Sequence, residues 1–191
     1  MEFDSVISKR KSVRAFKPKK PSWKDIIEIV EAALKAPSAS SQSHLKFIII
    51  ESTETIKELA RLAEQIWIGE SRYIILVCSN DASLESLYGN RGRVYSRQQA
   101  GAAIENLLLK VTDLGLAACW VGAYSDDTVR HLLRIPSNIQ IEAMIPIGYE
   151  FPGRTKSKRK KQSLESSIFW ESWDSTKRSK LFREPPIMAK R

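Results

Sequence analysis

The chain has 191 residues, of which 42% are hydrophobic and 28% are charged, so it can bury the core of one domain. Its wholly apolar runs, such as 47–50 and 73–78, are far shorter than the roughly 20 residues that cross a bilayer. The N-terminus has no apolar signal core, and the two cysteines lie in separate apolar segments that indicate no disulfide framework. We therefore expect no membrane contact and a cytoplasmic location. Two histidines and two cysteines without CxxC, HxH or HExxH spacing predict no metal site.

The formal net charge of +9 is unevenly distributed along the chain. Residues 1–24 carry +6 and residues 154–191 carry +8, which leaves −5 for the middle. Two basic ends on an acidic body are compatible with solvated tails, with a footprint for nucleic acid, or with two halves of one anion site. The charged content is also compatible with a heat-adapted host. Composition does not choose among these interpretations.

The first half of the chain predicts two helices and two strands. Ser22 and Asp25 have capping-box spacing, and the apolar residues that follow predict a helix from about Trp23 to Lys35. A small polar loop, 36–43, comes next, because Pro37 disfavours helix at the residue before it. The remaining predicted elements are a strand at 46–51, a helix with apolar positions from Ile56 to Ile66, and a strand buried on both faces at 73–78.

The second half is organised around one long apolar stripe. Its residues recur at helical spacing from Ala100 to Leu114 and end at Gly115, as a helix with a C-cap glycine does. A polar stretch, 79–92, comes before it. We expect a strand at 117–124, a short helix from Ser125 to before Pro136, and a last core strand at 141–149.

The order of elements indicates a layered fold. The chain has no internal repeat, no GxGxxG and no GxxxxGK[ST], so dinucleotide-binding and P-loop classes lose their main support. Helices that alternate with strands around one long apolar helix indicate an α+β or α/β protein. Beyond Gly153 the chain becomes strongly basic and then aromatic, which predicts a C-terminal arm on a single compact domain.

Three segments carry more specific motifs. Residues 8–16 read SKRKSVRAF, residues 31–39 read EAALKAPSA, and QAGAAIENLLL at 99–109 leads through LGL to CWVGAY at 119–124. They are followed by IP at 135–136 and IGY at 147–149. In this order and spacing they resemble the nitroreductase family of FMN-dependent oxidoreductases, over most of the chain.

The resemblance implies a three-layer α+β fold, in which helices pack a mixed β-sheet around a central buried helix. Residues 1–153 would form the FMN-binding domain, and residues 154–191 would add a basic segment and an arm that wraps the partner of a homodimer. The aromatic side chains of that arm, which favour interfaces, would be dimer contacts: Phe169, Trp170 and Trp173. The implied activity takes hydride from NADH or NADPH onto flavin N5 and then reduces a nitroaromatic, a quinone or a similar substrate by a ping-pong mechanism.

The resemblance also implies which cations hold the cofactor. Arg10 would bind the phosphate through its planar guanidinium, and Arg14 would lie near the pyrimidine edge or the ribityl chain. Ser12 would bond the same region, with Lys11 contributing partly through its backbone. Plain surface charge is the alternative for each cation. Two more cations, from the run at 158–161, would complete the phosphate site: Arg159 and Lys161.

Gly122 is the implied catalytic residue, because its backbone N–H would bond N5 and favour electron density there as hydride arrives. Trp120 and Val121 would lie against the ring face, with core packing as the alternative for Trp120. The loop from the partner subunit would reach the other edge of the flavin. Its expected contacts are Pro37, Ser38, Ala39 and Ser41.

The chain departs from the family pattern in that loop, where APSxxNxQPW is usual and Ser41, Ser43, His44 and Leu45 stand here. Two polar contacts with the flavin are therefore expected to be lost. His44 is either a proton donor or a surface hydrogen-bonder. Residues 64–65 would meet the pyrimidine edge, and the small loop at 81–93 would cover the site and set the choice of acceptor. Cys119 is expected to be a buried, inert thiol.

A rival hypothesis follows from the same departures. The altered loop would then have lost flavin binding, and the chain would act as a binding protein, possible partners including nucleic acid held by RTKSKRKK at 154–161. Under the oxidoreductase hypothesis the partners are NADH or NADPH, a small electron acceptor and a second copy of the chain, and nucleic acid is not expected. A salt-sensitive affinity for polynucleotide with no bound flavin would separate the two.

Overall fold

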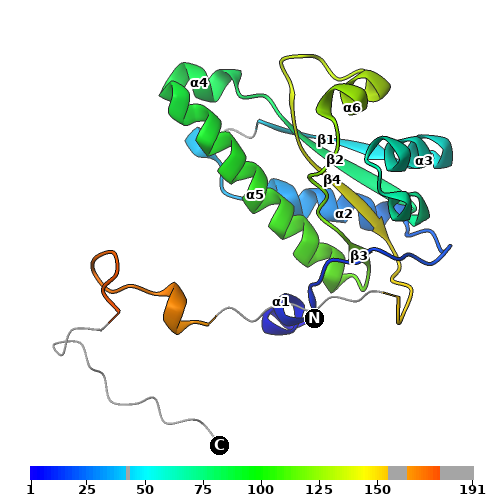
Figure 1. The fold of residues 1–191 in the computed structure, drawn as a ribbon, viewed down its shortest axis with the longest axis horizontal. Helices are drawn as coiled ribbons and strands as arrows, with labels where there is room; N and C mark the ends of the chain where they lie inside the picture. Colours follow the sequence, from blue (N-terminus) through cyan, green and yellow to red (C-terminus); the bar gives the residue numbers. More distant parts are fainter. Residues whose placement is uncertain (42–43, 155–162, 177–191) are drawn as a thin grey trace, which may run out of the picture. The chain divides into compact units, whose positions relative to one another are not determined.

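A computed structural model describes residues 1–41, 44–154 and 163–176 of the chain. The chain divides into two compact units, Met1–Ser157 and Lys158–Arg191. The first unit contains the sheet and the helices labelled in Figure 1. In the described part of the chain, no helix is long and apolar enough to cross a membrane.

One four-stranded sheet lies at the centre of the first unit, with the strand order β1-β2-β4-β3. Neighbouring strands pair antiparallel. Outside the named strands, Ser12 forms an isolated parallel bridge with Ala118. β2 is buried along its whole length, which confirms the prediction from its unbroken apolar run. The strands are β1 (Leu45–Ile50), β2 (Tyr73–Ser79), β3 (Ala117–Ala118) and β4 (Gln140–Gly148).

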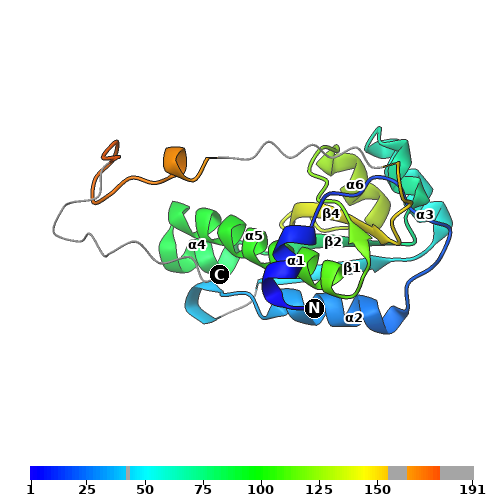
Figure 2. The same ribbon diagram turned by 90° about the horizontal axis from the view of Figure 1, so that it is seen from below.

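Helices cover both faces of the sheet, with α2 on one side and α6 on the other (Figure 2). Successive residues of β2 alternate between the two cores: Ile75 packs with α2 and α5, whereas Ile74 and Leu76 pack with α3 and α6. The helices of this unit are α1 (Phe3–Lys9), α2 (Trp23–Leu34), α3 (Thr53–Leu62), α4 (Ala82–Tyr88), α5 (Asn90–Asp113) and α6 (Asp126–Leu133), with 3-10 turns η1 (Ala39–Ser41) and η2 (Ile66–Glu70). The capping box at the start of α2 is present.

Three elements differ from the sequence-based expectation. The expected loop at 81–93 is helical: it contains α4 and the first turn of α5, which begins ten residues before the predicted start. α4 buries only Leu84. The segment 81–93 is therefore mostly polar, and no apolar stripe in the sequence indicates a helix there. α1 was missed for the same reason, since only Val6 is buried. β3 is only two residues long, because the backbone leaves the ladder after Ala118 and returns to β4 in an isolated bridge between Val121 and Met144.

α4 and α5 form a tightly packed helical hairpin. A Cβ atom added to Gly92 would lie 2.3 Å from the backbone carbonyl of Leu84, so only glycine permits this approach. The turn between the helices uses Gly89 at φ 56°. The hairpin therefore depends on two glycines, and the periodicity of apolar residues does not predict their role.

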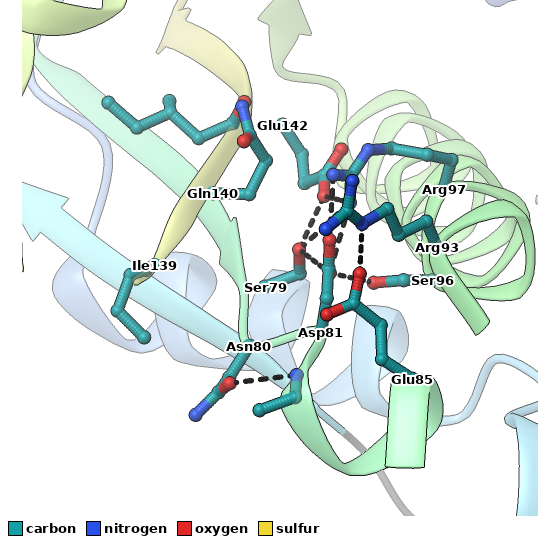
Figure 3. Close-up of polar contacts among 12 residues, drawn as sticks. Ser79, Asn80, Asp81, Glu85, Arg93, Ser96, Arg97, Ile139, Gln140 and Glu142 are labelled. Atoms are coloured by element: carbon teal, nitrogen blue, oxygen red, sulfur yellow. Dashed lines mark hydrogen bonds and ion pairs between the residues drawn. The ribbon is translucent and has the colours of Figure 1, made fainter. Parts of the chain in front are cut away.

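A polar cluster holds the first half of α5 to the ends of β2 and β4 (Figure 3). We call it the clasp, and its residues are Ser79, Asp81, Ser96, Arg97 and Glu142. Arg97 donates to Asp81 at 2.8 Å and to Glu142 at 2.5 Å. Burial raises the pKa of Glu142 despite the bonds from Ser79 and Arg97. Burial also acts to raise the pKa of Asp81, but hydrogen bonds from Arg97, Ser96 and Ser79 outweigh it and lower that pKa. One guanidinium thus joins two carboxylates, and these contacts hold the helix in place.

The second unit is described over residues 163–176, with the 3-10 turn η3 (Glu165–Ser167). The rings of Phe169 and Trp173 meet edge to face with centroids 5.0 Å apart, and Trp173 is 83% exposed. The role of these side chains as dimer contacts stays a prediction. Arg159 and Lys161, expected at the phosphate, lie outside the described residues.

Candidate active site

The motif segment 10–14 runs beside β3. Ser12 forms the bridge to Ala118, and the backbone N–H of Val13 donates to the carbonyl of Ala118 at 2.9 Å. Val13 is buried and packs with Phe16 and Ala117. Because successive side chains of an extended chain point to opposite sides, the buried valine leaves Ser12 and Arg14 on the outer side.

The cations of this segment are unequally compensated. Lys11 Nζ lies 2.8 Å from a carboxylate oxygen of Glu150, whereas Arg10 Nε lies 3.6 Å from Glu105 of α5. The Arg10 side chain is only 14% exposed, so its guanidinium is held in place with a weak partner. Arg10 is therefore the better candidate for a phosphate, and Lys11 is largely neutralised.

The segment 119–122 presents alternate side chains to the core and to the surface. Cys119 and Val121 are buried, and Trp120 is 42% exposed, so core packing does not account for the tryptophan. Val121 is 4% exposed in the single chain, and its expected place against the ring face stays a prediction. Its side chain packs in a core cluster with Ile141 and Met144, and the bridge to Met144 fixes the backbone here.

Gly122 faces open space. A Cβ atom added there would meet no heavy atom of the protein within 4 Å, so the packing of this chain does not require glycine at this position. Close approach of a bound group is a physical reason for the residue. The amide of Gln65 donates to the carbonyl of Ala123 at 3.0 Å, which brings the end of the α3 region beside Gly122.

Cys119 shows that the two motif segments converge. Burial raises the pKa of its thiol, while the charge of Arg14, a hydrogen bond with Ser12 and the charge of Arg10 act in the opposite direction. The thiol is buried, as predicted, but basic residues surround it, which its sequence neighbours do not indicate. Three side chains from 10–14 thus gather at the residue before Trp120.

Trp67 of η2 is a site residue that sequence reasoning missed. Its ring lies 5.9 Å from the guanidinium carbon of Arg14 and 6.4 Å from the ring of Phe16. A single aromatic residue after a helix has no sequence signal that separates it from an ordinary core residue. Trp67 is identified by its contacts with Arg14 and Phe16, which lie far from it in the sequence.

The loop 37–41 lies elsewhere, against the first half of α5. Pro37, Ser38 and Ala39 line a cavity of about 210 Å³ there, and Ser40 contacts Tyr88. No hydrogen bond or ion pair between described residues joins this loop to 10–14 or to 119–123. Within one chain, therefore, the structure brings together two of the three motif segments.

His44 is buried rather than on the surface. It is 8% exposed, and its Nδ1 lies 3.2 Å from the hydroxyl of Ser83 on α4. The expectation of a surface hydrogen-bonder is wrong, because α4 forms over the histidine where a loop was predicted. Its role as a proton donor stays a prediction.

The donors gathered here match the chemistry of one ligand class. Arg10 and Arg14 supply positive charge, Ser12 supplies a hydroxyl, Trp120 an exposed ring, and Gly122 a backbone N–H beside open space. A phosphate, a polyol chain and a flat ring that accepts a hydrogen bond are the complementary parts. FMN has these parts.

Comparisons with known proteins agree with this chemistry. The model of the nitroreductase family matches residues 7–81 and 60–149. An Archaeoglobus fulgidus protein provisionally named NADH dehydrogenase/NAD(P)H nitroreductase is 30% identical in an alignment of 152 residues. The alignment covers 75% of this chain and 83% of that protein. The chain belongs to the nitroreductase family, as its motifs predicted.

Crystal structures extend the likeness to the fold. A protein of the same provisional name from Parabacteroides distasonis superposes with a TM-score of 0.76 at 26% identity, covering 91% of this chain and 99% of that one. The NADPH:FMN oxidoreductase of Vibrio harveyi, in complex with NAD+, has a TM-score of 0.79 at 17% identity, covering 91% and 78%. At that identity it shows the fold alone. The predicted nitroreductase fold is confirmed.

Proposed function

We propose that the protein is a homodimeric, FMN-dependent NAD(P)H oxidoreductase that reduces a second substrate by a ping-pong mechanism. Its cofactor is FMN and its electron donor is NADH or NADPH. The observation that carries the proposal is the convergence of 10–14 and 119–123 on one surface, with open space at Gly122. Nitroaromatics and quinones are the acceptor classes that the family name and the resemblance favour.

Arg10 would hold the phosphate end of the cofactor, and Ser12 would bond the region that Arg14 faces. The Arg10 guanidinium can make two parallel charge-assisted bonds to a phosphate, and its weak contact with Glu105 leaves those donors available. Arg14 would lie closer to the ring, where the contact with Trp67 fixes the guanidinium. Positive charge near the ring favours a reduced, anionic cofactor.

The chemistry that FMN supplies when bound is acceptance of hydride from NAD(P)H and its transfer to the second substrate. The residue that acts at the reacting atom is Gly122, whose backbone N–H would donate to N5. Trp120 would cover part of the ring and exclude water from it. Gln65, bonded to Ala123, would keep the Gly122 segment in one position.

A second copy of the chain would complete the site, because the loop 37–41 does not reach the other two motifs within one chain. The surface formed by α1, α2 and α5 supports a dimer. It exposes Phe3, Ile7 and Leu34 by 66%, 44% and 52%, and Phe3 also lines a cavity of about 360 Å³. Exposed apolar patches of this kind mark association surfaces. The two buried free cysteines suit the reducing cytoplasm.

The test is a visible absorbance spectrum of the purified protein, taken as isolated, after excess FMN and desalting, and after anaerobic NADH or NADPH. Retained flavin that bleaches with either nucleotide is the expected result. Protein that holds no added FMN would exclude the oxidoreductase. Light scattering after size exclusion gives the oligomeric state of the same sample, and a flavin-bound monomer would exclude the dimeric site.

A further inference from the structure

Two tyrosines connect the loop 37–41 to the α4–α5 hairpin. The hydroxyls of Tyr88 and Ser40 lie 2.7 Å apart, and the rings of Tyr88 and Tyr95 meet edge to face with centroids 5.2 Å apart. Ser40 has φ 56°, a left-handed conformation that is uncommon for a residue other than glycine. The Tyr88 hydroxyl bonds the loop at this residue and fixes the loop against the aromatic pair.

Tyr95 is also a wall of the cavity beside that loop. The volume of about 210 Å³ exceeds the roughly 150 Å³ of an apolar protein cavity that holds benzene. A single aromatic ring therefore has room, and an aromatic side chain favours such a ring in an offset or edge-to-face arrangement. The lining residues are Pro37, Ser38, Ala39, Tyr95, Gln98, Gln99 and Ala102.

Arg91 adds a cation next to this wall. It lies one helical turn before Tyr95 on the same face of α5, with its guanidinium carbon 5.6 Å from the centroid of the Tyr95 ring. No carboxylate of the described residues forms an ion pair with it. The next two arginines of the helix differ, because Arg93 pairs with Glu85 and Arg97 pairs with the carboxylates of the clasp (Figure 3).

The clasp and the tyrosine wall occupy different faces of the same helix. Arg93 and Arg97 point toward the ends of β2 and β4 (Figure 3), so the clasp fixes α5 from one side while Arg91 and Tyr95 remain on the other. An uncompensated cation beside an aromatic cavity attracts an aromatic compound with a negative group, since the ring gains apolar contact and the charge gains a partner.

We propose that this cavity binds the ring of the second substrate and selects a single-ring aromatic compound with an anionic group, through Tyr95 and Arg91. The proposal rests on the proposed function, because only there does the loop of one subunit reach the cofactor of its partner. It narrows the acceptor from a broad chemical class to aromatic anions such as nitrobenzoates.

Binding to the oxidised, FMN-loaded protein tests this without turnover. Isothermal titration calorimetry with 4-nitrobenzoate and with neutral nitrobenzene, in the absence of NAD(P)H, gives two dissociation constants. We expect 4-nitrobenzoate to bind about tenfold more tightly at low salt, with the preference falling as NaCl is added. Equal constants for the two probes would overturn the proposal.

Variants assign the preference to its residues. Arg91→Gln is expected to remove it while nitrobenzene binds as before, and Tyr95→Leu is expected to weaken both probes. Arg93→Gln is the matched control, since this arginine is two residues away but paired with Glu85, and it should keep the preference within about twofold. A preference that survives Arg91→Gln, or that Arg93→Gln removes equally, would overturn the assignment to Arg91.

Flavin retention and bleaching, measured on the same samples, separate the two levels of the hypothesis. Protein that retains and reduces FMN but binds both probes equally would exclude the anion-selective cavity alone. Protein that holds no FMN would exclude the proposed function and the cavity's role with it. Circular dichroism of each variant checks its fold. If Tyr95→Leu does not fold, Tyr95→Phe takes its place; it keeps the ring and should bind both probes like the wild type.

Discussion

The guanidinium carbon of Arg14 lies 5.9 Å from the centroid of the Trp67 ring. This contact joins the N-terminal motif to η2. The residue before that turn, Gln65, donates to the carbonyl of Ala123, which follows Gly122. A cation held over an aromatic face is stabilised by the ring's quadrupole. The pair therefore links the charged end of the candidate site to its catalytic end.

Replacing the Trp67 ring should weaken FMN binding. We expect Trp67→Leu to lower FMN affinity because Arg14 loses its support, which is worth about 0.5–2 kcal/mol, or roughly 2- to 30-fold in the dissociation constant. Fluorescence titration of the flavin-free protein with FMN measures it. Trp23→Leu, at an exposed tryptophan at the start of α2, is the control, and equal constants for the two variants would remove Trp67 from the site.

Arg10 should matter more than any surface cation. Arg10→Ala is expected to weaken FMN binding by about 1.5–3 kcal/mol, or roughly 10- to 150-fold, because a charge-assisted bond to phosphate is lost. Lys24→Ala serves as the control, since Lys24 is exposed and forms no ion pair with the described residues. The same titration, carried out on both variants, contradicts the phosphate assignment if their affinities are alike.

A substitution at Gly122 should weaken FMN binding without changing the stability of the fold. Gly122→Ala adds a methyl group that meets no protein atom within 4 Å, so its thermal unfolding should match that of the wild type. If the ring of FMN approaches the backbone here, the methyl group costs about 1–3 kcal/mol of binding, roughly 5- to 150-fold. Wild-type affinity in a stable Gly122→Ala protein would show that the cofactor does not approach this residue.

Gly92 should show the opposite behaviour. A Cβ atom there lies 2.3 Å from the Leu84 backbone, so Gly92→Ala must separate α4 from α5 and should cost about 2–4 kcal/mol of stability. Gly101→Ala, on the same helix with nothing within 4 Å of its Cβ position, should instead stabilise by about 0.5–1 kcal/mol. Urea unfolding of the two variants distinguishes the effect of packing from that of helix propensity. A Gly92→Ala protein of wild-type stability would refute the close approach of α4 to α5.

The buried Cys78 should make the protein sensitive to alkali. Burial raises the pKa of its thiol to about 11 from an ordinary value of 9.0, so between these pH values the unfolded chain releases a proton that the folded chain keeps. The free energy of unfolding is unaffected by this group below about pH 8 and falls as pH rises through 9 to 11.

Cys78→Ala isolates this contribution. Its loss of stability between pH 8 and pH 10.5 should be smaller than that of the wild type by about 1–2 kcal/mol, since each unit of pKa corresponds to about 1.4 kcal/mol. Urea unfolding at the two pH values measures the difference. Comparing slopes with pH cancels the packing that the variant loses, and identical slopes would mean that the thiol is not protected.

Local signals in the sequence determined a large part of this protein. The capping box at Ser22 and the apolar spacing after it predict α2, and the unbroken apolar run of β2 predicts a strand buried on both faces, because these features depend on residues close together in the chain. The order of the motifs at 8–16, 31–39 and 99–124 was sufficient to identify the nitroreductase family and its fold.

Tertiary structure decided the rest, since it depends on residues far apart in the chain. The bridge to Met144 turns Val121 into the core, and Trp67 becomes a site residue only because Arg14 lies against it. The hairpin of α4 and α5 forms where a loop was predicted, because Gly92 permits the two helices to approach closely and the clasp holds α5 to the sheet. Composition and periodicity record neither contact, and so neither the aromatic wall at Tyr95 nor the opening at Gly122 could be predicted from the sequence.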